Sequence, residues 1–411
     1  MNSSKTYIWR LGLMVLIGLT GLTGCSDDSE EGRGPRVTIE AQSGAVGYAE
    51  ETGTRGFGAT RSDPESPTWA PDYYLYKDLN SPFEGRKDLM NKSIGVFFAQ
   101  SNSATPEEGI FFYSDYDELW HLSNTEILTG DYFLYGFIPT EDAAGAAISS
   151  ADYSDGAVLT IHDLDAVTPS DVCVIIGAKD GTDKNTVTGL QAGSFATHLN
   201  PTGTSATSGD KKNFIFLLFD HLYSALRFNF LVDSEYAKLR TIKLRQLELV
   251  AYSDDNEGAV KAKYNVSITL QKKTDGSSPI TNVTYTPDPS SGDVNPVLLY
   301  DWKNDHSRYL TLSATEPTSF MGSFVPGDNV YFKLRSTYDV YDKNVTTEHP
   351  EGNLIRERCQ AENSFDLRMK FGSFLTTTRG HSYSYTITVQ PTYIYMLSEP
   401  DLDNPTMVIS N

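Results

Sequence analysis

Alternation of large apolar and polar residues is the dominant pattern along this chain. In residues 383–389, "YSYTITV", the large apolar side chains fall on odd positions and the hydroxyl side chains on even ones. Residues 37–42, 226–230 and 330–335 alternate in the same way. Successive side chains of a strand point to opposite faces of a sheet. A period of two therefore predicts half-buried β-strands in all four segments.

Two apolar runs lack this alternation, at residues 132–138 and 214–219. A continuous apolar run of this length is typical of a strand that is covered on both faces. No segment shows a long amphipathic helix pattern, and Gly, Pro, Asn and Asp separate the short apolar runs. The sequence therefore predicts an all-β fold of stacked antiparallel sheets.

The alternation changes phase once within residues 240–250. Ile242 and Leu244 share one parity, whereas Leu247 and Leu249 share the other. One extra residue in a strand shifts the side chains that follow it to the opposite face. We therefore predict a β-bulge near Arg245–Gln246, which would return all four apolar side chains to one face.

Chain length and one loop suggest two domains. The chain has 411 residues, which is more than a single core usually organises. Residues 199–212, "LNPTGTSATSGDKK", are rich in Gly, Ser, Thr and Pro and lie between apolar strands. This composition predicts a domain junction, although a long hairpin loop would look alike. We expect an N-terminal β-domain at residues 36–205 and a C-terminal β-domain at residues 206–411.

The amino terminus has the pattern of an export signal. Lys5 and Arg10 are basic, and the apolar stretch at residues 11–22 is shorter than the roughly 20 residues that span a bilayer. The next letters, "LTGC", resemble the lipobox of bacterial lipoproteins, in which the signal is cut before the cysteine and the thiol is lipidated. We expect a signal peptide at residues 1–24 and lipidation of Cys25. The alternative is an ordinary signal peptide with a chance cysteine.

Charge limits the partners of the mature chain. The net charge is −21, and loss of Lys5 and Arg10 with the signal makes it −23. Nucleic acid requires a basic face, so we expect no nucleic-acid partner. An acidic tether at residues 25–35 contains the run "SDDSEE", which resembles the export signal of surface lipoproteins of Bacteroidetes. We therefore expect a chain held by its lipid on the outer membrane, at the cell surface.

Catalytic motifs are not found in the sequence. It contains no His-Glu-x-x-His, Gly-x-Ser-x-Gly, Cys-x-x-Cys or phosphate-binding glycine loop. His221 borders an apolar strand and is expected to be structural. Cys173 and Cys359 have no metal-ligand spacing, and free thiols are favoured over a disulfide between them. The acidic loops at residues 152–155, 180–183 and 254–257 could bind Ca²⁺, but solvated turns are favoured. We expect no enzyme activity, no cofactor and no metal.

Four segments in order resemble the fimbrillin family, the type V pilins and related lipoproteins of Bacteroidetes. They are "RVTIEA" at residues 36–41, "YGFIPT" at 135–140, "FDHLYSALRFNF" at 219–230 and "GHSYSYTITV" at 380–389. The resemblance implies two transthyretin-like antiparallel β-sandwich domains in tandem. It also implies a fimbrial role in cell adhesion, with other pilus subunits as partners through strand exchange.

The same resemblance implies an assembly route. A protease that cuts after arginine would remove the first strand, and a donor strand from a neighbouring subunit would fill the groove. Arg55 and Arg61 lie in the loop after that strand and match the expected cleavage position. Alternatively, they are simply arginines in a loop that is prone to nicking.

The carboxyl end modifies this expectation. Pro400 and Pro405 should interrupt strand pairing, and the apolar piece at residues 407–410 is short for a donor strand. The leading interpretation is a fimbrial subunit or an accessory or tip adhesin that meets a host or bacterial surface ligand. A stand-alone glycan-binding lipoprotein of a polysaccharide-uptake system is the alternative. An all-β hydrolase ranks last, because no carboxylate pair can be picked out.

Overall fold

The computed structural model describes most of the chain, all of it within one compact unit at residues 34–411. Described residues are 37–43, 49–51, 93–101, 105–114, 119–123, 127–181, 189–199, 213–303, 310–327, 330–344, 346–347, 352–371, 373, 375–394 and 399–410. Within these ranges no helix is long and apolar enough to cross a membrane.

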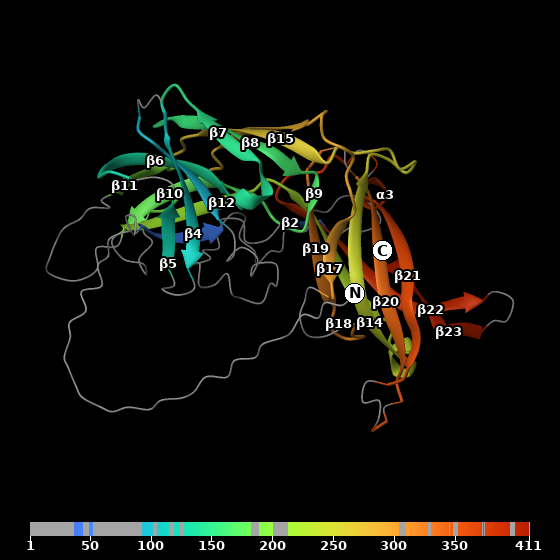
Figure 1. Cartoon of the computed structure of the whole chain (residues 1–411). Coiled ribbons are helices and arrows are strands. Elements are labelled where there is room, and N and C mark those ends of the chain that lie inside the picture. The colour runs from blue at the N-terminus through green and yellow to red at the C-terminus, as the bar shows by residue number, and fades with distance from the viewer. Residues whose placement is uncertain are drawn as a thin grey trace, which may run out of the picture. The chain divides into compact units, whose positions relative to one another are not determined.

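Four β-sheets make up almost all of this structure (Figure 1). The largest sheet has the order β1-β12-β10-β6-β3-β4-β5, with β11 paired to β6. Its strands are β1 (Val37–Ser43), β3 (Ile94–Ala99), β4 (Glu107–Ser114), β5 (Leu119–Ser123), β6 (Gly130–Ile138), β10 (Cys173–Gly181), β11 (Ala196–Leu199) and β12 (Asn213–His221). A four-stranded sheet has the order β16-β15-β8-β7. Its strands are β7 (Gly145–Ser149), β8 (Gly156–Asp165), β15 (Lys263–Gln271) and β16 (Ile280–Pro287).

The other two sheets contain mainly the second half of the chain. One has the order β2-β22-β13-β19-β9, with β23 also paired to β22, and the other has the order β17-β14-β20-β21, with β18 paired to β14. The strands of the first are β2 (Ala49–Glu51), β9 (Val167–Thr168), β13 (Ser224–Val232), β19 (Thr318–Phe324), β22 (His381–Ile394) and β23 (Glu399–Ser410). Those of the second are β14 (Arg240–Tyr252), β17 (Val297–Asp301), β18 (Leu310–Thr311), β20 (Tyr331–Asp342) and β21 (Leu354–Asp366). Short helices occur at η3 (Thr140–Asp142), α2 (Tyr236–Leu239) and α3 (Leu367–Phe371).

The all-β prediction is confirmed, and most neighbouring strands are antiparallel. Three pairs are parallel: β1 with β12, β2 with β22 and β13 with β22. Alternation along one strand reveals the face that is buried but carries no information about the direction of its neighbour. The expectation of antiparallel sheets was therefore wrong at these three pairs and right for the other strand pairs that the structure describes.

Strand β12 is buried on both faces, as its continuous apolar run predicted. Ile215, Leu217 and Phe219 belong to one core cluster, whereas Phe216 and Leu218 belong to another. None of the five side chains is more than 3% exposed. A strand that contributes to two cores has no polar face, and this explains the absence of alternation.

The predicted β-bulge in β14 is confirmed. The pairing with β20 shifts register between Leu244 and Gln246, so that Arg245 is the extra residue. Ile242, Leu244, Leu247 and Leu249 are all fully buried despite their different parity. One inserted residue returns both pairs of side chains to the core face.

Strand pairs cross the predicted domain junction at residues 205 and 206. Strands β12 and β15 follow the junction, and they pair with β10 and β8, which precede it. Strand β9 precedes the junction and pairs with β19, which follows it. The two predicted domains therefore share strands across this loop, and their boundaries stay a prediction.

The expectation that Pro400 and Pro405 interrupt pairing was wrong for Pro400 and right in part for Pro405, since the register with β22 passes over residues 402–404. Strand β23 runs antiparallel to β22 (Figure 1). Pro400 lies opposite Tyr393, and Pro405 lies opposite Pro391. Proline lacks a backbone N–H, and it is tolerated on an edge strand where that position does not contribute to the ladder. The register shifts between Pro391 and Thr392, which is where the proline pair meets.

Candidate functional site

The first described strand closes one edge of the largest sheet. Strand β1 runs parallel to β12, and the register extends from Val37 opposite Asn213 to Ser43 opposite Phe219. The other neighbour of β12 is β10. Without β1, the backbone N–H and C=O groups on the outer edge of β12 would lose their partners.

The slot that β1 fills is strongly apolar. Along the shared register, Ile39 lies opposite Ile215 and Ala41 lies opposite Leu217. Both of these β12 side chains are fully buried. Strand β1 also contacts β5, the strand at the far end of the same sheet order. The two ends of this sheet therefore meet at β1, and an extended segment placed there is covered on more than one side.

A second strand from the same segment closes an edge of another sheet. Strand β2 runs parallel to the start of β22, with Ala49 opposite His381 and Glu51 opposite Tyr383. Strand β13 occupies one edge of β22, so β2 and β23 share the opposite edge. β2 covers the first part of that edge, and β23 begins its pairing beyond it, at Thr386. Residues 37–51 thus contribute edge strands to two sheets.

The sequence-predicted site residues lie outside the described residues. These are Cys25, Arg55 and Arg61. The structure does describe the strands that precede both arginines, and cleavage at either arginine would separate β1 and β2 from the rest of the chain. The sequence predicted β1 as the strand that cleavage would remove. It did not indicate that β2 would pair in a second sheet, because this pairing depends on β22, which is far away in the chain.

A compact polar cluster lies at the carboxyl end of β12. Cys173 is the first residue of β10 and pairs directly with His221, the last residue of β12. Asp171 precedes Cys173 by two positions, so it returns to the same side of the extended chain. His221 Nδ1 lies 2.6 Å from Asp171 Oδ2 and 3.6 Å from Cys173 Sγ. His221 is buried, as expected of a structural histidine.

Electrostatics argue against a nucleophilic thiol in this cluster. Burial raises the pKa of Cys173 to about 12, with a further contribution from the Asp171 charge. Burial opposes a charged His221, but the Asp171 carboxylate, together with Cys173, outweighs it and raises the imidazole pKa. A catalytic base needs one ring nitrogen for the nucleophile and the other for the orienting carboxylate. Here both groups face the same nitrogen, so the arrangement is not that of a cysteine hydrolase.

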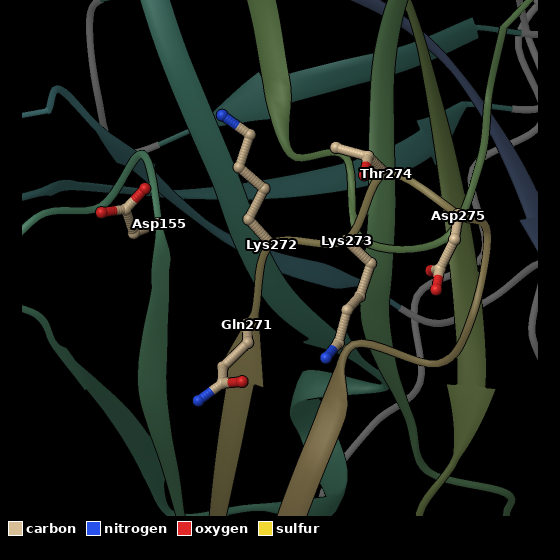
Figure 2. A pocket seen from close by; sticks show the side chains of 6 residues that line it. All are labelled: Asp155, Gln271, Lys272, Lys273, Thr274 and Asp275. Atoms are coloured by element: carbon tan, nitrogen blue, oxygen red, sulfur yellow. The ribbon is translucent and has the colours of Figure 1, made fainter.

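The surface hollows of the described chain hold no converging set of reactive groups. The hollow in Figure 2 has a volume of about 500 Å³ and is lined by Asp155 and residues 271–275. Its Lys272 and Lys273 side chains point in opposite directions (Figure 2). A second hollow of about 400 Å³ lies between β16 and residues 326–327 and 377–379.

The acidic loops that could have bound Ca²⁺ are used within their own turns where they are described. Asp152 Oδ1 accepts a hydrogen bond from the Ser154 N–H at 2.9 Å, and this contact lowers the pKa of Asp152. Asp254 Oδ1 accepts hydrogen bonds from the N–H groups of Asn256 and Gly258. These geometries are those of carboxylate-capped turns. The third loop, at residues 180–183, lies partly outside the described residues.

Solved structures similar to this chain include candidate cell-adhesion proteins and a fimbrial protein from Bacteroides, at low identity and high coverage. A candidate cell adhesion protein from Bacteroides fragilis is 12% identical, with 92% of this chain and 97% of that chain covered and a TM-score of 0.37. One from Bacteroides uniformis is 12% identical, with coverage of 92% and 99% and a TM-score of 0.33. A fimbrial protein from Bacteroides vulgatus is 11% identical, with coverage of 77% and 91% and a TM-score of 0.28. No protein-family model and no curated protein matches this chain.

Proposed function

We propose that this chain is a surface-anchored fimbrial subunit, or an accessory or tip adhesin, that is assembled by strand complementation and mediates cell adhesion without catalysis. The observation that carries the proposal is the pairing of residues 37–51. This one segment supplies a parallel edge strand to β12 and another to β22. Its loss would open an apolar slot beside β12 and an edge on β22, and an added extended strand would satisfy both.

The proposed route begins at the cell surface. Lipid on Cys25 holds the chain on the outer membrane, and the acidic tether places the folded part away from the lipid. A protease cuts after Arg55 or Arg61 and releases β1 and β2. A donor strand from another pilus subunit then pairs with β12, and its alternate side chains set the register. In this proposal the four sheets are organised as two transthyretin-like β-sandwich domains in tandem.

The carboxyl-terminal strand favours an accessory or tip role over a stalk role. Strand β23 is already paired with β22 of the same chain, and its Met407 is only 4% exposed. The Asn363 side-chain amide also donates a hydrogen bond to the Met407 carbonyl at 2.9 Å. A stalk subunit must offer a strand to its neighbour. Here the last strand contributes to its own fold.

The test is controlled cleavage of the chain from Ser26, which lacks the lipid. An arginine-specific protease should cut after Arg55 or Arg61, and mass spectrometry should show loss of the fragment that carries β1 and β2. The cleaved chain should then bind a fluorescent peptide of residues 36–51, whereas the uncut chain should not. A variant with Arg55→Gln and Arg61→Gln is the matched control.

Three outcomes separate the alternatives. Growth of SDS-resistant ladders from the cleaved chain would identify a stalk subunit, whereas peptide uptake without ladders would identify an accessory or tip subunit. A cleaved chain that takes up no strand would overturn the proposal. If such a chain were retained on a polysaccharide gel, it would be a stand-alone glycan binder.

A further inference from the structure

We propose that Asp171, Cys173 and His221 form a binding site for a divalent transition-metal cation of the zinc class. Their ligand atoms, one oxygen, one sulfur and one nitrogen, all lie within 4.8 Å of one another. Carboxylate, thiolate and imidazole are the side chains that bind Zn²⁺ in proteins. This inference does not depend on strand exchange.

The spacing of the sulfur and the nitrogen fits one tetrahedral ion. Zn–S and Zn–N bonds of about 2.3 and 2.0 Å, at a tetrahedral angle, place the two ligand atoms about 3.5 Å apart. The observed separation of Cys173 Sγ and His221 Nδ1 is 3.6 Å. Asp171 Oδ2 lies 2.6 Å from the same nitrogen, a hydrogen-bond distance. Two oxygen or nitrogen ligands of one ion lie about 3.3 Å apart, so the carboxylate needs to withdraw by less than about 1 Å.

The use of a single ring nitrogen is the second argument. His221 Nδ1 faces both the carboxylate and the thiol. One nitrogen carries either one hydrogen or one lone pair, so it cannot serve two partners equally well. An ion bound to that lone pair would instead be shared by all three side chains. Metal binding would release the thiol proton and the Nδ1 proton to solvent, as thiolate and neutral imidazole are the ligand forms.

The fold holds the three ligands on a rigid frame. Cys173 and His221 are direct neighbours across the antiparallel pair of β10 and β12. Asp220, beside His221, forms an ion pair with Arg379 at 2.6 Å. Asp171 is therefore the carboxylate that belongs to the cluster. The Arg379 side chain also donates a hydrogen bond to the His221 carbonyl at 3.1 Å, which fixes the backbone at this position.

Charge and access are also compatible with an ion. A thiolate and a carboxylate together carry two negative charges, which a divalent cation neutralises in a buried position. The Asp171 side chain is 18% exposed, whereas that of His221 is 6% exposed. The carboxylate therefore marks the side from which an ion can enter. The bound ion would join β10 to β12, and so would support the strand whose other edge is covered by β1.

The experiment is a cobalt titration of the untagged chain from Ser26, followed by zinc calorimetry. Co²⁺ bound to Cys173 should give a thiolate-to-cobalt absorption band that saturates at one ion per chain, and Zn²⁺ should remove it. Cys173→Ser should abolish the band, and His221→Gln should weaken zinc binding by about 100-fold or more, since loss of even an outer partner weakens metal sites by 10- to 100-fold. Cys359→Ser is the matched control, because this thiol is free, half-buried and on β21.

Asp171→Asn provides a variant that keeps the shape of the cluster, in case Cys173→Ser does not fold. It should retain the cobalt band with weaker affinity. Three results would overturn the proposal: no band with the unaltered chain, a band that persists in Cys173→Ser, or zinc binding that is equal in the unaltered chain and in His221→Gln. Circular dichroism of each variant establishes that it is folded before it is titrated.

Discussion

Removal of the Asp339 carboxylate should strongly destabilise the sheet that contains the β-bulge. Asp339 is 1% exposed, and both of its oxygens accept hydrogen bonds from Arg245 Nη1, at 3.1 and 3.0 Å. It also accepts a hydrogen bond from the Arg358 N–H at 2.8 Å. Removing one partner of a buried ion pair costs about 3–5 kcal/mol, because the other charge stays buried. Glu357 lies 3.0 Å from the same Nη1 and retains part of the pairing, so we expect about 3 kcal/mol for Asp339→Ala.

The assay is the free energy of unfolding from urea titration, with Glu357→Ala as the matched control. Glu357 binds the same guanidinium, but its side chain is 52% exposed, so its removal should cost less than about 1 kcal/mol. Arg245 also stacks on Trp302, with its guanidinium carbon 5.1 Å from the ring centroid. Because both variants keep Arg245, we expect the tryptophan emission of the folded protein to shift little to the red in either variant. Equal effects of the two variants, or a loss below about 1 kcal/mol for Asp339→Ala, would refute the inference that a buried Arg245–Asp339 ion pair stabilises the bulge.

Two further predictions concern the largest sheet and the acid stability of the chain. Gly136 lies in β6, where an added Cβ would overlap the Gly95 carbonyl of β3, so Gly136→Ala should lower the thermal midpoint markedly. An added Cβ at Gly145 would meet open space, so Gly145→Ala should not lower the midpoint. Similar midpoints for the two variants would contradict this packing. Hydrogen bonds from Lys333 and Arg335 lower the pKa of Glu362, so the unfolded chain takes up this proton at a higher pH than the folded chain. Its stabilisation is therefore present above the unfolded pKa of about 4.3 and is lost as the pH falls through the folded value. Urea midpoints between about pH 7 and pH 3 should fall less steeply for Glu362→Gln, and an unchanged slope would show that this ionic contact does not contribute.

Local patterns predicted the strands well. Period-two alternation identified β13, β20 and β22, and the change of phase located the bulge at Arg245. The unbroken apolar run of β12 indicated burial on both faces. Each of these features is determined by which side chains meet the core, and that information is contained in neighbouring residues.

Long-range pairing was beyond the reach of those patterns. The parallel pairing of β1 and β2, and the joining of β15 to β8, depend on partners that are distant in the chain. The Asp171, Cys173 and His221 cluster exists only because β10 and β12 pair in one register, which brings residues 48 positions apart into contact. Asp171-x-Cys173 is a weak signal by itself, and nothing local points to His221.

The carboxyl terminus shows a different limit. Two prolines normally argue against a strand, and they led to the expectation of broken pairing, which holds only at residues 402–404 of β23. The strand forms because it lies at a sheet edge, where a missing N–H is tolerated. The assignments of Cys25, Arg55 and Arg61 rest on local motifs and on the family resemblance, and they stay predictions.

Hydrogen–deuterium exchange of β12 tests the central claim most directly. The amides of residues 213–219 should be protected in the uncut chain, because β1 and β10 cover both edges of this strand. After release of residues 26–55 or 26–61, the amides that face β1 should exchange faster, and a peptide of residues 36–51 should restore their protection. The amides of β14, in a different sheet, serve as the internal control. Unchanged protection of β12 after complete removal of the fragment would contradict strand complementation as the function of this chain.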